Sequence, residues 1–208
     1  VMRLALMASG TGSNVEVLLS EKQSGKLPLV DWVLLGCDRL DAPVIQKARS
    51  KVLKTWVHSP SEFAEKTHYE KSLHQVLTEQ EVDGIVLAGY MRLIGPTLLE
   101  HWQGRIINLH PSLLPSFPGQ HSIQDALKYR VKLTGCTVHF VDEGIDTGPI
   151  IAQESVPIFS TDTIETLTKR IHQAEYSLLP KTVRRWSEGG FYLKDKIVHF
   201  VDEVGETI

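Results

Sequence analysis

Short apolar runs alternate with segments of helical pattern through the first half of this 208-residue chain. Each run has the length and composition of a buried strand, whereas the longer segments between them carry helical spacing. Alternating strands and helices predict a parallel, doubly wound α/β sheet with right-handed crossovers. The predicted strands are 3–8, 32–37, 54–57, 84–89 and 106–109, and the predicted helices begin at Val15 and cover 43–51, 63–81 and 97–102.

The second half departs from this alternation. Residues 122–129 predict a helix, and 135–141 and 150–156 predict two strands joined as a hairpin. A long helix opens at 161–165, and a terminal hairpin over 191–193 and 196–201 is expected to cover a sheet edge. We therefore expect one domain with helices on both faces of a mostly parallel sheet and an antiparallel portion in its C-terminal half.

Composition narrows the class of protein. With 42% hydrophobic and 23% charged residues, the chain can bury one sizeable core, and a net charge of −3 gives no general basic surface for nucleic acid. Cys37 and Cys136 lie far apart inside apolar runs, which favours buried free thiols in a reducing compartment. We see no charged leader and no run of eighteen apolar residues. We thus expect a cytoplasmic protein that does not enter a membrane.

A glycine-rich loop follows the first predicted strand. In Ser9-Gly10-Thr11-Gly12-Ser13-Asn14 the glycines allow a close backbone approach, and the following helix points free N–H groups at an anion. Val15 stands where a dinucleotide fingerprint has its third glycine, and no Walker lysine follows, so we expect a small-molecule phosphate rather than NAD or ATP. The alternative is a tight turn without ligand, with Ser13 or Asn14 capping the helix, as Asp41 is expected to cap the next one.

Two polar side chains leave the fifth predicted strand on one face. Asn108 and His110 are two residues apart, and Pro111 ends the strand directly after them, at the edge where open α/β sheets bind ligands. Asn can donate N–H to a developing negative charge, and His titrates near neutral pH. An acid brought from the loop 142–146 would orient the imidazole, although that loop could hold its acids for solubility alone. An Asn, a His and an acid so arranged are typical of an acyl-transfer site.

Other chemistries find less support. There is no Gly-x-Ser-x-Gly elbow, neither cysteine neighbours a motif, and Ser112 between two prolines is interpreted as a structural hydroxyl, so no covalent acyl-enzyme is indicated. The nine histidines show no paired ligand spacing, and we predict no metal. His172 and Glu175 face one side of the long helix, where a surface pair is the simpler interpretation. The apolar loop 90–96 is either packed locally or lines a pocket for a flat, partly apolar ligand.

Taken together, four motifs make the chain resemble the phosphoribosylglycinamide formyltransferase family of purine synthesis. They are 9–14, Leu87-Ala88-Gly89-Tyr90-Met91-Arg92, Asn108-Leu109-His110-Pro111-Ser112-Leu113-Leu114-Pro115 and Asp146-Thr147-Gly148-Pro149-Ile150-Ile151. The third marks the wider formyltransferase superfamily, and the first narrows it to this member. The resemblance implies a Rossmann-like fold and direct transfer of a formyl group from the co-substrate 10-formyltetrahydrofolate to the amine of glycinamide ribonucleotide.

The resemblance also implies roles for residues. Asn108, His110 and Asp146 would be catalytic, and the phosphate and ribonucleotide would be held by Gly12, Ser13, Asn14, His172 and Glu175. The folate would contact Lys66, where relatives commonly carry arginine, together with Met91, Arg92, Leu93, Ile94, Asn108, Asp142, Glu143, Gly144, Ile145 and Asp146. Residues 1–105 would form the phosphate and ribonucleotide-binding half, and 106–208 the catalytic and folate-binding half.

Two alternatives keep much of this site. A formyltetrahydrofolate hydrolase would retain the Asn, His and Asp and release formate to water, although its usual extra N-terminal domain is not expected in 208 residues. A folate-binding protein without turnover would need none of the three side chains. The expected partners are the two small substrates, with neither nucleic acid nor membrane, and the chain would be a monomer or a homodimer.

Overall fold

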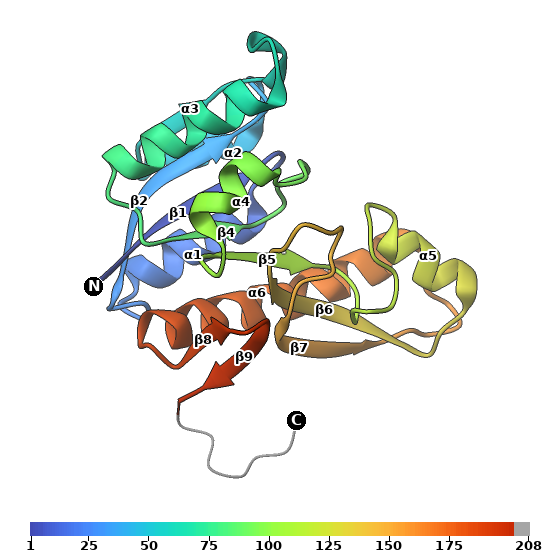
Figure 1. The fold of residues 1–208 in the computed structure, drawn as a ribbon. Helices are drawn as coiled ribbons and strands as arrows, with labels where there is room; N and C mark the ends of the chain where they lie inside the picture. Colours follow the sequence, from blue (N-terminus) through green and yellow to red (C-terminus); the bar gives the residue numbers. More distant parts are fainter. Residues whose placement is uncertain (202–208) are drawn as a thin grey trace.

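The computed structural model describes residues 1–201, which form one seven-stranded sheet, six helices and a separate two-stranded hairpin (Figure 1). The strand order of the large sheet is β3-β2-β1-β4-β5-β6-β7. β1 to β5 pair in parallel, and β5–β6 and β6–β7 pair antiparallel. The strands are β1 (Met2–Ala8), β2 (Val30–Cys37), β3 (Thr55–Val57), β4 (Gly84–Leu87), β5 (Ile106–His110), β6 (Leu133–Phe140) and β7 (Ile150–Pro157). The predicted fold class is confirmed.

Helices cover both faces of the sheet. Buried side chains of α1, α2 and α6 join one hydrophobic core, and those of α3 and α4 join a second core on the opposite face. The bounds are α1 (Ser13–Gln23), α2 (Pro43–Ser50), α3 (Lys66–Glu79), α4 (Pro96–Trp102), α5 (Ser122–Tyr129) and α6 (Ile164–Ser187). No helix within residues 1–201 is long and apolar enough to cross a membrane.

The central strand β1 shows why its sequence is almost entirely apolar. Leu4, Leu6 and Ala8 enter the core beneath α1, α2 and α6, whereas Ala5 and Met7 enter the core beneath α3 and α4. All five are at most 1% exposed, as expected for a parallel strand covered on both faces. The chain runs from β1 outward to β2 and β3, then returns to β4 on the other side. The ends of β1 and β4 therefore form the topological switch point, where such sheets bind ligands.

Two local predictions are wrong. The residue that caps α1 is Gly12 in a left-handed conformation, and Ala42 rather than Asp41 caps α2, in neither case through a side chain. The predicted terminal hairpin is present as β8 (Phe191–Lys194) and β9 (Ile197–Phe200), which form their own sheet and do not pair with the large one. Phe191 packs on Phe140 of β6 and Trp186 of α6, so the hairpin closes the core at the end of α6.

Candidate active site

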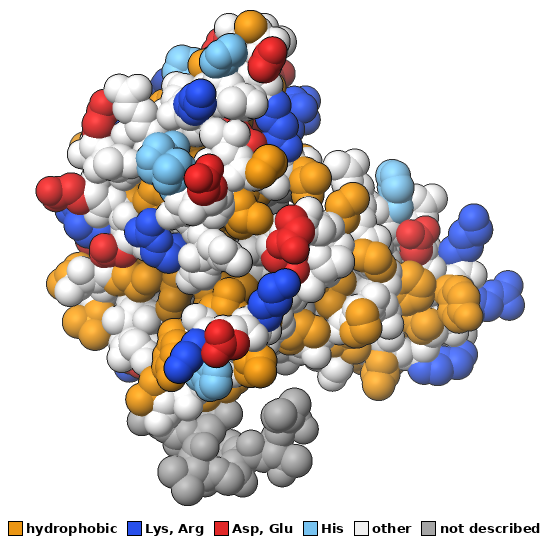
Figure 2. All heavy atoms as spheres, in the orientation of Figure 1, with side chains coloured by type: hydrophobic (Ala, Val, Ile, Leu, Met, Phe, Trp, Pro, Cys, Tyr) orange, Lys and Arg blue, Asp and Glu red, His pale blue; other side chains and the backbone are white. Residues whose placement is uncertain are grey.

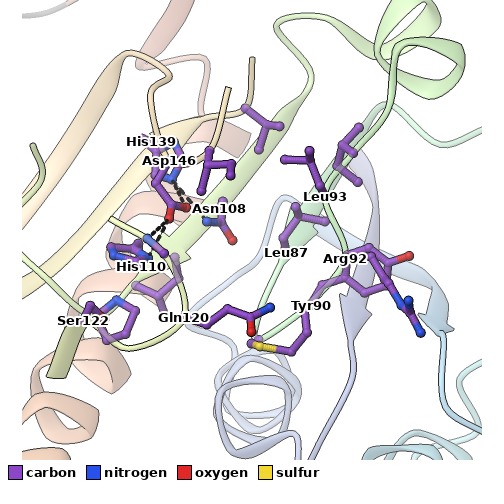
Figure 3. A pocket seen from close by; sticks show the side chains of 18 of the residues that line it. Leu87, Tyr90, Arg92, Leu93, Asn108, His110, Gln120, Ser122, His139 and Asp146 are labelled. Carbon is purple, nitrogen blue, oxygen red and sulfur yellow. Dashed lines mark hydrogen bonds and ion pairs between the residues drawn. The ribbon is translucent and has the colours of Figure 1, made fainter. Parts of the chain in front are cut away.

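A cavity of about 500 Å³ opens at the carboxyl ends of β4 and β5, beside the loop between β6 and β7. Figure 3 shows its two walls, with Asn108, His110, His139 and Asp146 on one side and Tyr90, Arg92 and Leu93 on the other. Hydrophobic side chains gather around the middle of this face in Figure 2 and continue over β6 and β7. Three exposed hydrophobic side chains line the cavity: Met91, Leu93 and Ile145. The volume and lining suit one small, partly apolar ligand.

Asn108 and His110 come from β5 and lie on the same face, as predicted. Each is held by a hydrogen bond whose direction follows from its partner. His110 Nε2 lies 2.9 Å from the carbonyl oxygen of Phe117, and because that oxygen only accepts, Nε2 carries the proton. His110 Nδ1 is therefore the ring nitrogen left for other partners. It faces Asp146, with Nδ1 3.4 Å from Oδ2.

Asp146 reaches β5 from the loop between β6 and β7. Its backbone is left-handed at φ 53°, and its carboxylate faces His110 on β5 and His139 on β6. Oδ2 also accepts a hydrogen bond of 2.8 Å from the Gly119 backbone N–H, and Oδ1 lies 3.8 Å from Nε2 of His139. The predicted trio of Asn108, His110 and Asp146 is thus brought together from one strand and one loop, as Figure 3 shows.

His139 was not predicted as a site residue, although it lies opposite Asn108 in the antiparallel β5–β6 pair. Its Nδ1 donates to the carbonyl oxygen of Phe140 at 2.8 Å, and burial lowers the pKa of its imidazole. In the neutral ring Nε2 therefore accepts, and the donor at 3.1 Å is Nδ2 of Asn108. This bond fixes which end of the Asn108 amide faces β6. The sequence signal was a histidine between two apolar residues, Val138 and Phe140, of a predicted strand.

A second group of polar side chains joins the start of α1 to the middle of α6. Asn14 Nδ2 donates to Glu175 Oε2 at 3.0 Å, and His172 Nε2 lies 4.0 Å from the same oxygen. Glu175 is 4% exposed, and burial raises the pKa of its carboxyl from 4.5 to about 7, against the opposing effect of the Asn14 bond. Asn14 Oδ1 is buried and finds no partner within residues 1–201. Glu175 thus forms a buried junction with Asn14 of the glycine loop, whereas the side chain of His172 is 41% exposed.

The glycine loop itself requires glycine at position 12. Gly12 has φ 71°, and a Cβ there would clash with the side chain of Val44 on α2. The loop delivers Gly12 and Ser13 to the start of α1, where the first N–H groups of a helix lack partners inside the helix. That geometry suits an anion.

The predicted folate contacts fall into two groups. Met91, Arg92, Leu93, Ile94, Asp142, Gly144, Ile145 and Asp146 line the cavity with Asn108 and His110, whereas Glu143 does not. Lys66 lies instead in an adjoining hollow of about 370 Å³, which shares the wall formed by 91–94. The cavity is lined by residues from both predicted halves of the chain, before and after residue 105.

Within residues 1–201 we find no group of three or more His, Cys, Asp or Glu arranged to hold a metal.

The nucleophiles considered from sequence are engaged or buried. Ser112 is fully buried and donates to the Ser116 carbonyl oxygen at 2.6 Å, as expected for a structural hydroxyl. Both cysteines are buried, and burial raises the pKa of the Cys136 thiol to about 12.

Comparison with known proteins decides the family. The profile described as formyl transferase matches residues 2–183. The chain belongs to the formyl transferase family. It is 42% identical over 187 residues to phosphoribosylglycinamide formyltransferase of Bacillus subtilis, covering 88% of this chain and 93% of that protein.

Two further relatives extend the comparison. The crystal structure of glycinamide ribonucleotide transformylase 1 from Symbiobacterium toebii superposes with a TM-score of 0.93 at 36% identity, covering 97% of this chain and 95% of that one. The trifunctional purine biosynthetic protein adenosine-3 of Chironomus tentans is 38% identical over 93% of this chain, which spans only 14% of that protein. The similarity thus covers the whole sheet and the residues of the site.

Proposed function

We propose that this enzyme transfers the formyl group of 10-formyltetrahydrofolate to the amine of 5'-phosphoribosylglycinamide, a step of purine biosynthesis. The observation that carries the proposal is the juxtaposition of Asn108, His110 and Asp146 at the end of β5, inside a cavity of suitable size. Met91 of the cavity lining is hydrogen-bonded to Ser9 at the start of the glycine loop. The family match and the 42% identity to the Bacillus subtilis enzyme support it.

In this mechanism the amine nitrogen bonds to the formyl carbon and the bond from that carbon to N10 breaks. One proton passes from the amine to N10, so formylated ribonucleotide and tetrahydrofolate leave. Between these steps the formyl oxygen carries negative charge, and donors placed in advance stabilise such charge strongly. One N–H of Asn108 Nδ2 is held by His139, which leaves the other for the formyl oxygen. The His110 imidazole beside it would add positive charge when Nδ1 is protonated as well as Nε2.

Asp146 has two tasks in the proposal. Its Oδ2 faces His110 Nδ1 and stabilises the charged imidazole, and a water held near the same carboxylate would relay the proton between the two nitrogens. The Gly119 N–H keeps the carboxylate in this position. Holding both substrates against each other supplies the proximity contribution to the rate.

The two substrates would approach from different sides. Gly12, Ser13 and Asn14 would hold the phosphate at the start of α1, with His172 and Glu175 on the ribonucleotide. The folate ring would lie between Met91, Arg92, Leu93, Ile94 and the loop 142–146, where the lining is apolar with polar groups at its edge. Lys66 would contact the folate tail from the adjoining hollow.

The acceptor is tested with purified protein and 10-formyltetrahydrofolate. Deformylation is followed alone, with glycinamide ribonucleotide, and with glycinamide that lacks the ribose phosphate. The proposal predicts fast turnover only with the ribonucleotide. Equal rates with and without acceptor would instead indicate a hydrolase, and folate binding without any reaction would indicate a binding protein.

A further inference from the structure

The loop after β4 is fastened to the end of β1 by Ser9. The Ser9 backbone N–H donates to the Gly89 carbonyl oxygen at 2.9 Å, and the Met91 backbone N–H donates to Ser9 Oγ at 2.9 Å. The Ser9 hydroxyl proton is then used on a third partner, Asp38, at 2.5 Å from Oδ1. A single buried serine therefore connects the loop to two strands of the sheet.

Asp38 is the charged centre of this arrangement. It follows directly on β2 and is only 3% exposed. Both of its carboxylate oxygens accept a hydrogen bond. Oδ1 accepts from Ser9, and Oδ2 accepts from Arg92 Nε at 2.9 Å. A buried carboxylate is costly unless it is paired and hydrogen-bonded, so Asp38 strongly favours the positions of Ser9 and Arg92 that satisfy it. We call these three residues the Asp38 anchor.

The anchor supports the cavity wall that lies opposite the catalytic trio. Arg92 and Tyr90 lie on that wall in Figure 3, and residues 91–94 line both the cavity and the adjoining hollow. The Arg92 side chain is 52% exposed, whereas that of Asp38 is 2% exposed, so the ion pair holds a half-exposed cavity residue from beneath. The Tyr90 hydroxyl also forms a hydrogen bond of 3.0 Å with the hydroxyl of Tyr69. The wall is thus held in place by the protein's own contacts.

We propose that Asp38 is a positioning residue that presets the loop 89–94 for the folate co-substrate. The inference rests on the proposed function for the identity of that ligand. Asp38 itself does not line the cavity, so it acts through Ser9 and Arg92. A preformed loop loses less conformational freedom when the ligand binds, which raises affinity without any new contact. The ribonucleotide side, built on Asn14 and Glu175, meets the anchor only through Ser9 at the start of the glycine loop.

The test compares Asp38→Ala and Asp38→Asn with Asp31→Ala. Asp31 is the matched control because it also pairs with an arginine, Arg3 at 3.1 Å, but lies near the start of β2, whereas Asp38 follows its end. Breaking a charge-assisted bond predicts a rise of about tenfold or more in KM for 10-formyltetrahydrofolate in Asp38→Ala. The ribonucleotide KM should change much less than the folate KM, since Asn14 and Glu175 contact neither Asp38 nor Arg92. Asp38→Asn keeps the shape and one acceptor, so it should fall between wild type and Asp38→Ala.

A readout independent of turnover separates this inference from the proposed function. Calorimetric titration with tetrahydrofolate should weaken in Asp38→Ala and Asp38→Asn by the same factors as the KM, and remain unchanged in Asp31→Ala. Wild-type protein that binds tetrahydrofolate but forms no formylated product would count against the proposed function alone. Unchanged affinity in the Asp38 variants, or equal losses for both substrates, would overturn the positioning role. If Asp38→Ala does not fold, Asp38→Asn carries the test.

Discussion

Replacing Glu175 by glutamine tests whether the junction between α1 and α6 holds a neutral carboxyl group. Burial raises the pKa of this carboxyl from 4.5 to about 7. A carboxyl whose pKa is higher in the folded state than in the unfolded state binds more protons when folded. The free energy of unfolding must therefore fall as the pH rises from about 4.5 to about 7.

The size of the effect follows from the shift. A difference of about 2.5 pKa units lowers the free energy of unfolding by about 3 kcal/mol above pH 7. At pH 5.5 the free energy of unfolding has fallen by only about 1 kcal/mol. Glutamine is neutral at every pH and still offers an oxygen to Asn14. Glu175→Gln should consequently gain about 2 kcal/mol more stability relative to wild type at pH 8.5 than at pH 5.5.

Urea denaturation followed by circular dichroism at both pH values measures this difference. Glu165→Gln is the control, since Glu165 lies exposed in the first turn of the same helix and its own backbone N–H lowers its pKa. That variant should show no gain at high pH. If the Glu175→Gln gain is the same at pH 5.5 and pH 8.5, Glu175 does not carry a proton near neutrality and the reasoning fails.

Four other substitutions have expected outcomes. His110→Ala and Asp146→Asn should each lower turnover by orders of magnitude while tetrahydrofolate affinity, measured by calorimetry, changes little; near-normal turnover would remove both from the mechanism. Gly12→Ala should lose about 2 kcal/mol or more in urea denaturation, because φ is 71° and the new methyl meets Val44. Val52, 94% exposed at φ 59°, is strained, so Val52→Gly should gain about 1 kcal/mol, and a lower melting temperature would contradict this.

The order of strands and helices could be predicted because it depends on short-range patterns. In β1 nearly every residue is apolar because both faces are covered, and in β5 the period of two is enough to place Asn108 and His110 on one face. Helix α5 begins and ends where its sequence predicted. These features follow from the local chain and need no knowledge of distant partners.

The missed features depend on contacts between distant residues. His139 meets Asn108 through the antiparallel register, which no local pattern specifies. Asn14 is a residue type that often caps helices, yet its side chain bonds to Glu175, 161 residues away in the sequence. Asp41 likewise is a suitable cap that the fold does not use. The same limit applies to Asp38, whose partners come from two other parts of the chain.

In the proposed mechanism the formyl group passes directly between two bound substrates at Asn108, His110 and Asp146. The most direct test uses 10-formyltetrahydrofolate labelled with carbon-14 in the formyl group and counts label in formylated ribonucleotide and in free formate. Direct transfer predicts one labelled ribonucleotide for each tetrahydrofolate formed, with no formate above the rate without enzyme. Label appearing in formate at the same rate with and without glycinamide ribonucleotide would contradict it.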